Sequence, residues 1–306
     1  MAYFGAVEGT GFEVVEPDFR ACLVGHARVE RLWTGARWCE GPAGFAAGRY
    51  LVFSDIPNDR MLRYDDCDGR VAVFRHPSNH SNGNTVDREG RLVTCEHLTR
   101  RVTRTEHDGR IIVLADRHAG KRFNSPNDVV VKSDGSIWFT DPDYGIKYDY
   151  EGGRAESEIG ARNVYRIDPA TAAVTTVADD FDHPNGLAFT PDERALYVAD
   201  SGFSEGVERP RHIRRFEVRD GGTLGDSKVF ATSTEGVFDG FRVDRDGRVW
   251  TSTGRGVECY RADGALIGRV KIPELVANVA FGGRARNRLF ICGTTSVYSL
   301  FLKVNG

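Results

Sequence analysis

One sequence plan occurs six times along the chain, and this repetition limits the possible folds more than any other feature. Each unit opens with a residue that carries a side-chain oxygen, then has a short apolar run, a turn and a second apolar run. The six opening residues, called anchors below, are Glu40, Asn82, Asn127, Asn185, Asp239 and Asn278. They lie 39 to 58 residues apart, which matches the length of a four-stranded propeller blade.

The clearest copy runs from Phe123 to Asp141 and contains the anchor Asn127, the apolar run Val-Val-Val, an Asp-Gly turn and the run Ile-Trp-Phe-Thr. Short β-rich runs bounded by such turns are typical of hairpins. Two further strands are expected to complete each unit. In the second unit these are residues 101–106 and 111–115, on either side of Asp108-Gly109.

The two ends of the chain indicate how the repeats close. The last unit has three strand-like runs, at 279–281, 288–292 and 296–302, and a further run, Val29–Trp33, precedes the first anchor. Pairing that run with the last unit would leave no open sheet edge. The sequence therefore predicts one all-β domain over residues 1–306: a six-bladed β-propeller whose ring is closed by an N-terminal strand. A two-domain β-sandwich would not explain six anchors in equal register.

Two units are longer than the others because of insertions at residues 142–162 and 201–212. Both are expected between the second and third strands of their blades, on the face where the anchors lie. Long loops on a rigid scaffold often carry binding residues. The alternative is that they are surface excursions without a role in binding.

The anchors themselves have two readings. Asn-Gly and Asp-Gly are common in turns, yet here each pair precedes an apolar strand, and Glu40 is no turn former. Two carboxylates and several amides that met in one channel would need a compensating charge, which a bound cation supplies. Oxygen donors without His or Cys favour a hard divalent ion, Ca²⁺ first, with Mg²⁺, Mn²⁺ or Zn²⁺ as alternatives.

The motifs around the anchors resemble those of the regucalcin/gluconolactonase family, in particular its bacterial gluconolactonases, which are six-bladed propellers that hydrolyse sugar lactones. The resemblance covers Trp38 to Gly283 and depends on five motifs, namely Glu40-Gly-Pro42, Asn124-Ser-Pro-Asn-Asp128 with Phe139-Thr-Asp-Pro142, Pro184-Asn-Gly-Leu187, Asp239-Gly-Phe-Arg-Val-Asp244, and Asn278 with Phe281-Gly-Gly283. It implies that Glu40, Asn127, Asn185 and Asp239 hold a divalent metal, and that Asp239 is also the general base or proton donor. Asn82 and Asn278 would then lie outside the ligand set.

One position departs from the animal branch of this family. That branch has a sugar-contacting Arg two residues before the second metal ligand, whereas this chain has Ser125. Other groups must then hold the sugar hydroxyls. By their place in the sequence, the candidates for substrate binding are Asn82, Asn124, Glu96, His97, His80 and Tyr144, although His80 and His97 could equally be structural.

The expected function is therefore metal-dependent hydrolysis of a sugar lactone, such as glucono-1,5-lactone, to the aldonic acid. One alternative is hydrolysis of phosphotriesters, because similar propellers use oxygen-ligated calcium for that reaction. Another is a non-catalytic propeller that binds calcium. A polar channel rich in Asn and His favours a sugar substrate.

Composition and terminal sequence limit the possible partners and cellular location. A net charge of −3 without a basic run argues against a nucleic-acid partner, and no run approaches the roughly 18 apolar residues of a membrane span. Met1–Glu16 has no signal-peptide pattern, and the six scattered cysteines favour reduced thiols. We expect a cytoplasmic protein. Gly202-Phe-Ser-Glu-Gly206 matches the serine-hydrolase motif, but the proline that follows argues against the strand-to-helix elbow that this motif requires.

Overall fold

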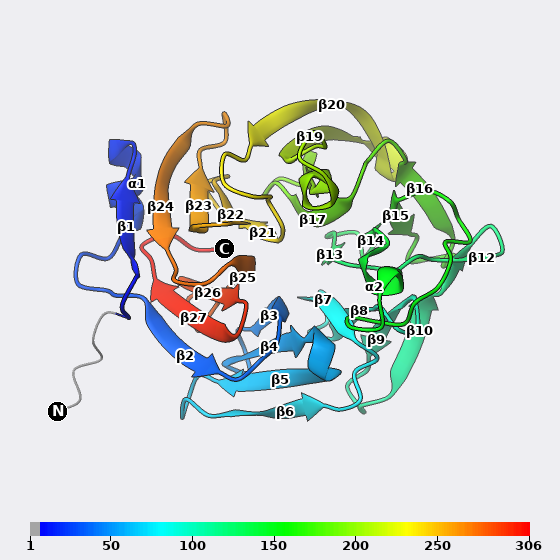
Figure 1. Cartoon of the computed structure of the whole chain (residues 1–306), viewed down its shortest axis with the longest axis horizontal. Coiled ribbons are helices and arrows are strands. Elements are labelled where there is room, and N and C mark those ends of the chain that lie inside the picture. Colours follow the sequence, from blue (N-terminus) through cyan, green and yellow to red (C-terminus); the bar gives the residue numbers. More distant parts are fainter. Residues whose placement is uncertain (1–6) are drawn as a thin grey trace.

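Six sheets of four or five strands surround a central channel (Figure 1), which confirms the predicted six-bladed propeller, and β11 and β12 form a separate two-stranded sheet. The structure is a computed structural model and describes residues 7–306. Residues 1–6, which begin both the predicted domain and the Met1–Glu16 segment, lie outside the described residues. In each blade the first strand of the unit lies innermost, so all six anchors lie in, or two residues before, the strands that line the channel.

The first three blades follow the chain from inside to outside. Blade 1 consists of β3 (Cys39–Phe45), β4 (Tyr50–Asp55), β5 (Arg60–Asp65) and β6 (Val71–Arg75). Blade 2 consists of β7 (Ser81–Val86), β8 (Leu92–Glu96), β9 (Arg101–Thr105) and β10 (Ile111–Ala115). Blade 3 consists of β13 (Val129–Val131), β14 (Ile137–Asp141), β15 (Asn163–Ile167) and β16 (Val174–Ala178).

The other three blades repeat this order, and the last two also take strands from the N-terminal region. Blade 4 consists of β17 (Pro184–Phe189), β18 (Ala195–Asp200), β19 (His212–Arg219) and β20 (Thr223–Thr232). Blade 5 consists of β21 (Phe241–Val243), β22 (Val249–Thr253), β23 (Gly256–Tyr260), β24 (Leu266–Lys271) and β1 (Gly11–Val14). Blade 6 consists of β25 (Val276–Gly282), β26 (Arg288–Gly293), β27 (Ser296–Phe301) and β2 (Glu30–Thr34).

The ring closes as predicted, because β2 pairs antiparallel with β27 and supplies the fourth strand of blade 6. One N-terminal strand was not predicted. β1 pairs with β24 as a fifth strand of blade 5, and the short helix α1 (Pro17–Cys22) follows it and buries Phe19 against Trp250. The N-terminal region therefore adds a strand to two neighbouring blades.

The turns within the blades form where Asp and Gly predicted them. In blade 2, Asp87 Oδ1 accepts hydrogen bonds from the amides of Glu89 and Arg91 at 2.9 and 2.8 Å. Gly90 closes the same turn at a φ of 79°, a left-handed conformation that glycine adopts without steric cost. The register of each hairpin is therefore fixed locally.

The two insertions leave the anchor-bearing end of blades 3 and 4. Residues 142–162 join β14 to β15 and contain the one-turn helix α2 (Tyr144–Lys147). Residues 201–211 join β18 to β19 and contain the 3₁₀ turn η2 (Gly202–Glu205). The remaining short elements are η1 (Ile56–Asn58), β11 (Arg117–His118), β12 (Lys121–Arg122) and η3 (Asp220–Gly222).

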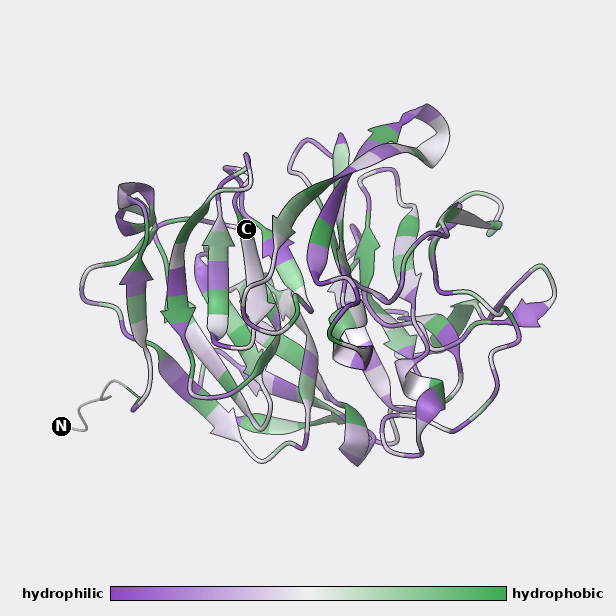
Figure 2. Cartoon of the chain, turned by 45° about the horizontal axis from the view of Figure 1, so that its top comes forward, coloured by the Kyte–Doolittle hydropathy of each residue, from purple (hydrophilic) through white to green (hydrophobic). Residues whose placement is uncertain are grey.

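Apolar side chains pack between neighbouring blades rather than in one central core. The largest cluster joins blades 5 and 6 and includes Trp250, Tyr298 and Ile291. Hydrophobic and hydrophilic segments accordingly follow one another along the strands throughout the molecule (Figure 2). All six cysteines are free thiols and five are buried. Among residues 7–306, no helix has the length and apolar character needed to cross a membrane.

Candidate functional site

Irregular hydrogen bonding turns the anchors toward the channel. In blades 1, 2, 4 and 6 the register of the innermost strand shifts at the anchor, as between Glu40 and Ala43 in blade 1. Such a bulge re-aims a side chain and is common beside functional sites. In blades 3 and 5 the strand begins two residues after the anchor, at Val129 and Phe241. The six anchors therefore stand at the end of the strands rather than within the regular ladder.

The glycine that follows an anchor makes a contact between blades. The amide of Gly83 donates to the carbonyl of Asn127 at 2.7 Å, and the amide of Gly186 donates to the carbonyl of Asp239 at 3.1 Å. A Cβ atom on either glycine would lie 2.3 or 2.2 Å from that carbonyl oxygen. The Asn-Gly pairs are thus explained by close approach of neighbouring backbones, and they are not turns.

A cavity of about 220 Å³ opens at this end of the channel. Four candidate ligands from the sequence (Glu40, Asn127, Asn185 and Asp239) and two candidate substrate contacts (Asn82 and Tyr144) line it. Its other lining residues are Trp38, Ile56, Glu151, Ser201, Ser204, Val237, Leu275 and Val276. The cavity is therefore lined by apolar side chains together with carboxylate and amide groups.

Two oxygen atoms in this cavity lack partners. Asn82 Oδ1 and Asn185 Oδ1 are buried and accept no hydrogen bond from any of residues 7–306. A buried amide oxygen without a partner costs about 1–3 kcal/mol, so such atoms indicate that a ligand belongs beside them. Because the carboxylates of Glu40 and Asp239 line the same cavity, a cation suits the site better than an anion.

The cavity has an excess of negative charge, which shifts the pKa values of Glu40 and Asp239. Burial raises the pKa of Glu40 to about 7, and the charge of Asp128 raises this pKa as well. Burial raises the pKa of Asp239 well above its usual value, as do the charges of Glu40, Asp128 and Glu151. Arg242 offsets part of this charge, since its guanidinium lies 3.4 Å from Asp128. A divalent cation would compensate for the rest.

Two side chains hold the oxygen donors in place. Asn278 Nδ2 donates to Glu40 Oε2 at 2.9 Å, while Asn278 Oδ1 accepts from the amide of Val279 at 2.8 Å. His97 Nε2 lies 3.3 Å from Asn82 Nδ2, which leaves Asn82 Oδ1 free to face the cavity. Asn278 and His97 therefore contact the side chains of Glu40 and Asn82 from behind and fix their orientation, an arrangement common around metal sites.

Acidic side chains at the ends of β14 and β18 hold the segments before two anchors. Asp141 accepts hydrogen bonds from the amides of Asn124 and Ser125, both at 2.9 Å. Asp200 accepts from the amides of Asp182 and His183 at 3.0 and 2.9 Å. In each blade these amides lie two and three residues before the anchor, so the acid fixes the approach of the chain to the channel.

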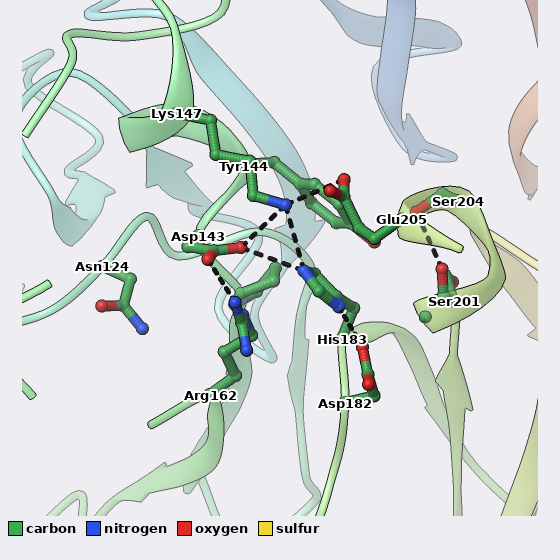
Figure 3. A network of polar contacts seen from close by, with 12 residues as sticks. Asn124, Asp143, Tyr144, Lys147, Arg162, Asp182, His183, Ser201, Ser204 and Glu205 are labelled. Carbon is green, nitrogen blue, oxygen red and sulfur yellow. Dashed lines mark hydrogen bonds and ion pairs between the residues drawn. The ribbon is translucent and has the colours of Figure 1, made fainter. Parts of the chain in front are cut away.

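The two insertions are joined by a cluster of charged side chains that we call the loop clamp (Figure 3). Lys147 Nζ lies 2.8 Å from Glu205 Oε1 and 3.3 Å from Asp143 Oδ1. Arg162 NH2 lies 2.6 Å from Asp143 Oδ2, and His183 Nε2 lies 3.1 Å from Asp143 Oδ1. The clamp thus connects α2, η2 and the segment that leads to Asn185.

The loop clamp positions Tyr144 at the cavity. The Tyr144 ring stacks on His183 with centroids 5.3 Å apart, and its hydroxyl lies 3.5 Å from Ser204 Oγ. Ser125 supports the same turn from below, because its Oγ donates to the carbonyl of Pro142 at 2.7 Å and accepts from the amide of Gly145 at 2.9 Å. Where an Arg was expected in the animal branch, this chain therefore has a serine that fixes α2.

Four predicted substrate contacts do not line the cavity: His97, which lies behind Asn82, and three residues whose side chains bond within the scaffold. Asn124 bonds to the carbonyls of Asp141 and Ala161 and accepts from Ser157. Glu96 is buried and accepts from Asn79, Thr99, Arg101 and Thr103. His80 Nδ1 lies 2.8 Å from the carbonyl of Ile56. The structure does not bring these residues to the site, because their polar atoms are used inside the scaffold.

Other residues at the cavity were missed at the sequence level. Trp38, Val237, Leu275 and Val276 carry no chemical signal that sets them apart from core residues. Glu151, Ser201 and Ser204 lie in the two insertions that were predicted to overhang the channel. The insertions were therefore expected near the site, but these three residues were not singled out. Ser204 stands on a 3₁₀ turn, and its Oγ donates to the carbonyl of Ser201 at 2.8 Å. Within residues 7–306 no imidazole contacts this hydroxyl, and the serine-hydrolase interpretation stays rejected.

The fold and the site together define a class: six-bladed propellers with oxygen donors gathered at one mouth of the channel. Residues 38–295 match the family model described as SMP-30/Gluconolactonase/LRE-like region. The chain therefore belongs to this family, as its motifs suggested.

Relatives and solved structures agree with this assignment. The chain is 28% identical to a gluconolactonase from Zymomonas mobilis, over 95% of this chain and 85% of that protein. It is 28% identical to the pentonolactonase XacC from Haloferax volcanii, over 84% of this chain and 82% of that protein. The structure of a gluconolactonase from Xanthomonas campestris is 42% identical, with a TM-score of 0.89, and covers 95% of this chain and 94% of that one.

A more distant structure shares the fold. Regucalcin from Agrobacterium tumefaciens, described as a calcium-binding protein, is 21% identical with a TM-score of 0.74, and the alignment covers 90% of this chain and 94% of that one.

Proposed function

We propose that this lactone hydrolase opens a sugar lactone to its aldonic acid with the help of a divalent cation, most simply Ca²⁺. One observation carries the proposal: buried amide oxygens of Asn82 and Asn185 without partners stand beside the carboxylates of Glu40 and Asp239 in a small cavity. Relatives named as a gluconolactonase and a pentonolactonase support the substrate class. Calcium binding by the regucalcin neighbour supports the ion.

Glu40, Asn127, Asn185 and Asp239 would hold the cation. Their donor set consists of two carboxylates and two amides, which suits a hard divalent ion and balances its charge. When bound, such an ion polarises the lactone carbonyl and stabilises the negative charge that develops on its oxygen. Asn278 would hold Glu40 in the orientation that binds the cation, and His97 would hold Asn82 in the orientation that binds the substrate.

The cavity sets the size of the substrate. At about 220 Å³ it is smaller than the ~300–1,000 Å³ of sites for drug-sized ligands, so a single sugar ring is the expected occupant. Asn82 Oδ1 and the hydroxyl groups of Tyr144 and Ser204 would bind sugar hydroxyls. Ile56, Val237 and Leu275 would cover the apolar C–H face of the ring.

Side chains of the protein would exclude bulk water from the cavity and transfer the proton. The loop clamp holds Tyr144 over the cavity and limits the access of bulk water. Asp239 is needed as a charge at the cation site, and the family resemblance also assigns proton transfer to it. Loss of the Asp239 carboxylate should therefore abolish activity.

The proposal is tested by measuring acid release from glucono-1,5-lactone and from five-carbon sugar lactones, with and without a chelator. We expect turnover that the chelator removes and Ca²⁺ restores, and we expect Asp239→Asn to be inactive. A wild-type protein that binds Ca²⁺ but hydrolyses none of these lactones would overturn the proposal. So would an Asp239→Asn variant that is as fast as wild type.

A further inference from the structure

The insertion at 142–162 brings a third carboxylate, that of Glu151, to the cavity of Glu40 and Asp239. Unlike those two, Glu151 belongs to no repeat unit and is not a candidate ligand. Its carboxylate makes no hydrogen bond or ion pair with any of residues 7–306. Of the two other carboxylates in the cavity lining, Glu40 accepts a hydrogen bond from Asn278 at 2.9 Å, and Asp239 is a candidate ligand of the cation. Glu151 is therefore free to interact with a molecule in the cavity.

The backbone around Glu151 is fixed by the fold. His97 Nδ1 lies 3.0 Å from the carbonyl oxygen of Glu151, and the amide of Gly153 donates to the carbonyl of Gly145 at 3.1 Å. A Cβ on Gly152 would lie 2.1 Å from that same Gly145 oxygen. The turn Glu151-Gly152-Gly153 is thus folded tightly back onto α2, and only glycine fits at its centre.

His97 connects this turn to Asn82 in the lining of the cavity. Its Nδ1 bonds to the backbone of residue 151, while its Nε2 lies 3.3 Å from Asn82 Nδ2. A Cβ on Gly145 would lie 2.6 Å from the His97 side chain, so α2 rests directly on this ring. One buried imidazole therefore sets the position of Glu151 relative to the amide oxygen of Asn82.

The surroundings of Glu151 are those of a group that exchanges protons. Glu151 and Asp239 line the same cavity, and the charge of Glu151 raises the pKa of Asp239. A second pocket shares Tyr144 and Glu151 with this cavity, and it is also lined by Tyr148, Tyr150 and the ion pair of Lys147 with Glu205 at 2.8 Å. Burial raises the pKa of Glu151 itself. A carboxylate with a raised pKa and no bound cation is a better base than one that ligates a cation.

We propose that Glu151 is the catalytic proton carrier for lactone opening, which leaves Asp239 to the cation site. Glu151 takes a proton from water while the water oxygen bonds to the carbonyl carbon of the lactone. The bond between that carbon and the ring oxygen then breaks, and Glu151 returns the proton to the ring oxygen as it becomes a hydroxyl group. The products are a hydroxy acid and the original carboxylate of Glu151.

This inference rests on the proposed lactone hydrolysis and gives to Glu151 a role that the family resemblance assigns to Asp239. Its experiment compares Glu151→Gln with wild type and with Glu156→Gln, an exposed residue of the same insertion. Because His97 binds the backbone of residue 151, the Gln variant should keep its fold. This is checked by thermal unfolding with and without Ca²⁺, which also reports whether the cation site is intact.

We expect Glu151→Gln to lower kcat for glucono-1,5-lactone by about 10²- to 10⁴-fold, with KM changed little and the Ca²⁺-dependent rise in Tm retained. Its rate should also lose the acid limb of the wild-type pH profile. Glu156→Gln should match wild type. A higher KM with unchanged kcat would show substrate binding only, and loss of the Ca²⁺ effect would show a ligand; either outcome overturns the inference, as does full activity. If wild type itself hydrolyses no lactone, the proposed function fails instead.

Discussion

The backbone amide of Gly186 donates a hydrogen bond of 3.1 Å to the backbone carbonyl of Asp239. This bond joins blade 4 to blade 5 at the channel, and it places the residue after one candidate ligand against the backbone of another. In the same way, the amide of Gly83, which follows the anchor Asn82, donates to the carbonyl of the candidate ligand Asn127. The oxygen donors of the site are therefore held at fixed spacing by contacts between blades, independently of any bound ion.

Replacing Gly186 by Ala should disturb the site through this contact. A Cβ would lie 2.2 Å from the Asp239 carbonyl oxygen, so the two blades must move apart. We expect a loss of about 1–3 kcal/mol in the free energy of unfolding, together with weaker binding of Ca²⁺. Urea unfolding checks the first effect and calorimetry the second. Gly25→Ala is the control, because a Cβ there meets nothing within 4 Å; equal stability of the two variants would contradict the argument.

Removal of Asn185 Oδ1 should weaken the effect of calcium on stability. A ligand that binds only the folded state at 100 times its Kd adds about 2.7 kcal/mol, and a chelator should remove this gain. Asn185→Ala should lose most of it. Asn163 also has a buried Oδ1 without a partner, but it lies outside the cavity lining, so Asn163→Ala should keep the full Ca²⁺ effect. Thermal unfolding in CaCl₂ and in EDTA makes the comparison.

Much of the architecture was predictable because its signals are local. Asp-Gly turns, short apolar runs and their spacing set six blades, and Val29–Trp33 had to pair somewhere once the last unit was one strand short. The insertions were also placed correctly between the second and third strands. β1 was not predicted, since Gly11–Val14 is too short to stand out and pairs with a strand more than 250 residues away.

The site was predictable to the extent that it follows the repeat. Glu40, Asn127, Asn185 and Asp239 do meet at one cavity, as does Asn82. Asn124 and Glu96 do not, because a residue chosen by its distance from an anchor gives no sign of where its own hydrogen-bond partners lie. Glu151 was missed because its position depends on the packing of Gly152 on Gly145 and on a bond to His97. Such contacts cross from one blade to another and leave no mark in the local sequence.

Neutralising Asp143 should loosen the loop clamp in a pH-dependent way. Burial raises the pKa of Asp143, but hydrogen bonds from His183 and Arg162 and the charge of Lys147 outweigh it, so the net shift is strongly downward. Because the pKa of Asp143 is lower in the folded state than in the unfolded state, where it is about 3.9, the ionised carboxylate stabilises the fold above that pH. This contribution is lost as the pH falls below about 3.9.

Asp143→Asn should therefore lower the free energy of unfolding at pH 7 by about 1–3 kcal/mol, since Lys147 and Arg162 lose a partly buried partner. The difference from wild type should shrink as the pH falls from about 4 toward 2. Unfolding in urea across this range measures it. Asp179→Asn, at an exposed position, should show no difference at any pH. A gap that stays constant down to pH 2 would show that the carboxylate charge is not the stabilising feature.

His97 should contribute a second pH dependence, at higher pH. Burial lowers its pKa to about 4, although the bond to the Glu151 carbonyl acts in the opposite direction. Since the unfolded chain takes up this proton near pH 6.5, stability is full above that pH and declines as the pH falls toward 4. The decline should reach about 3 kcal/mol at most and should be absent in His97→Gln, which should also be less stable at pH 7. Exposed His107, replaced by Gln, should keep the wild-type slope. If His97→Gln kept that slope too, the buried neutral imidazole would not be its source.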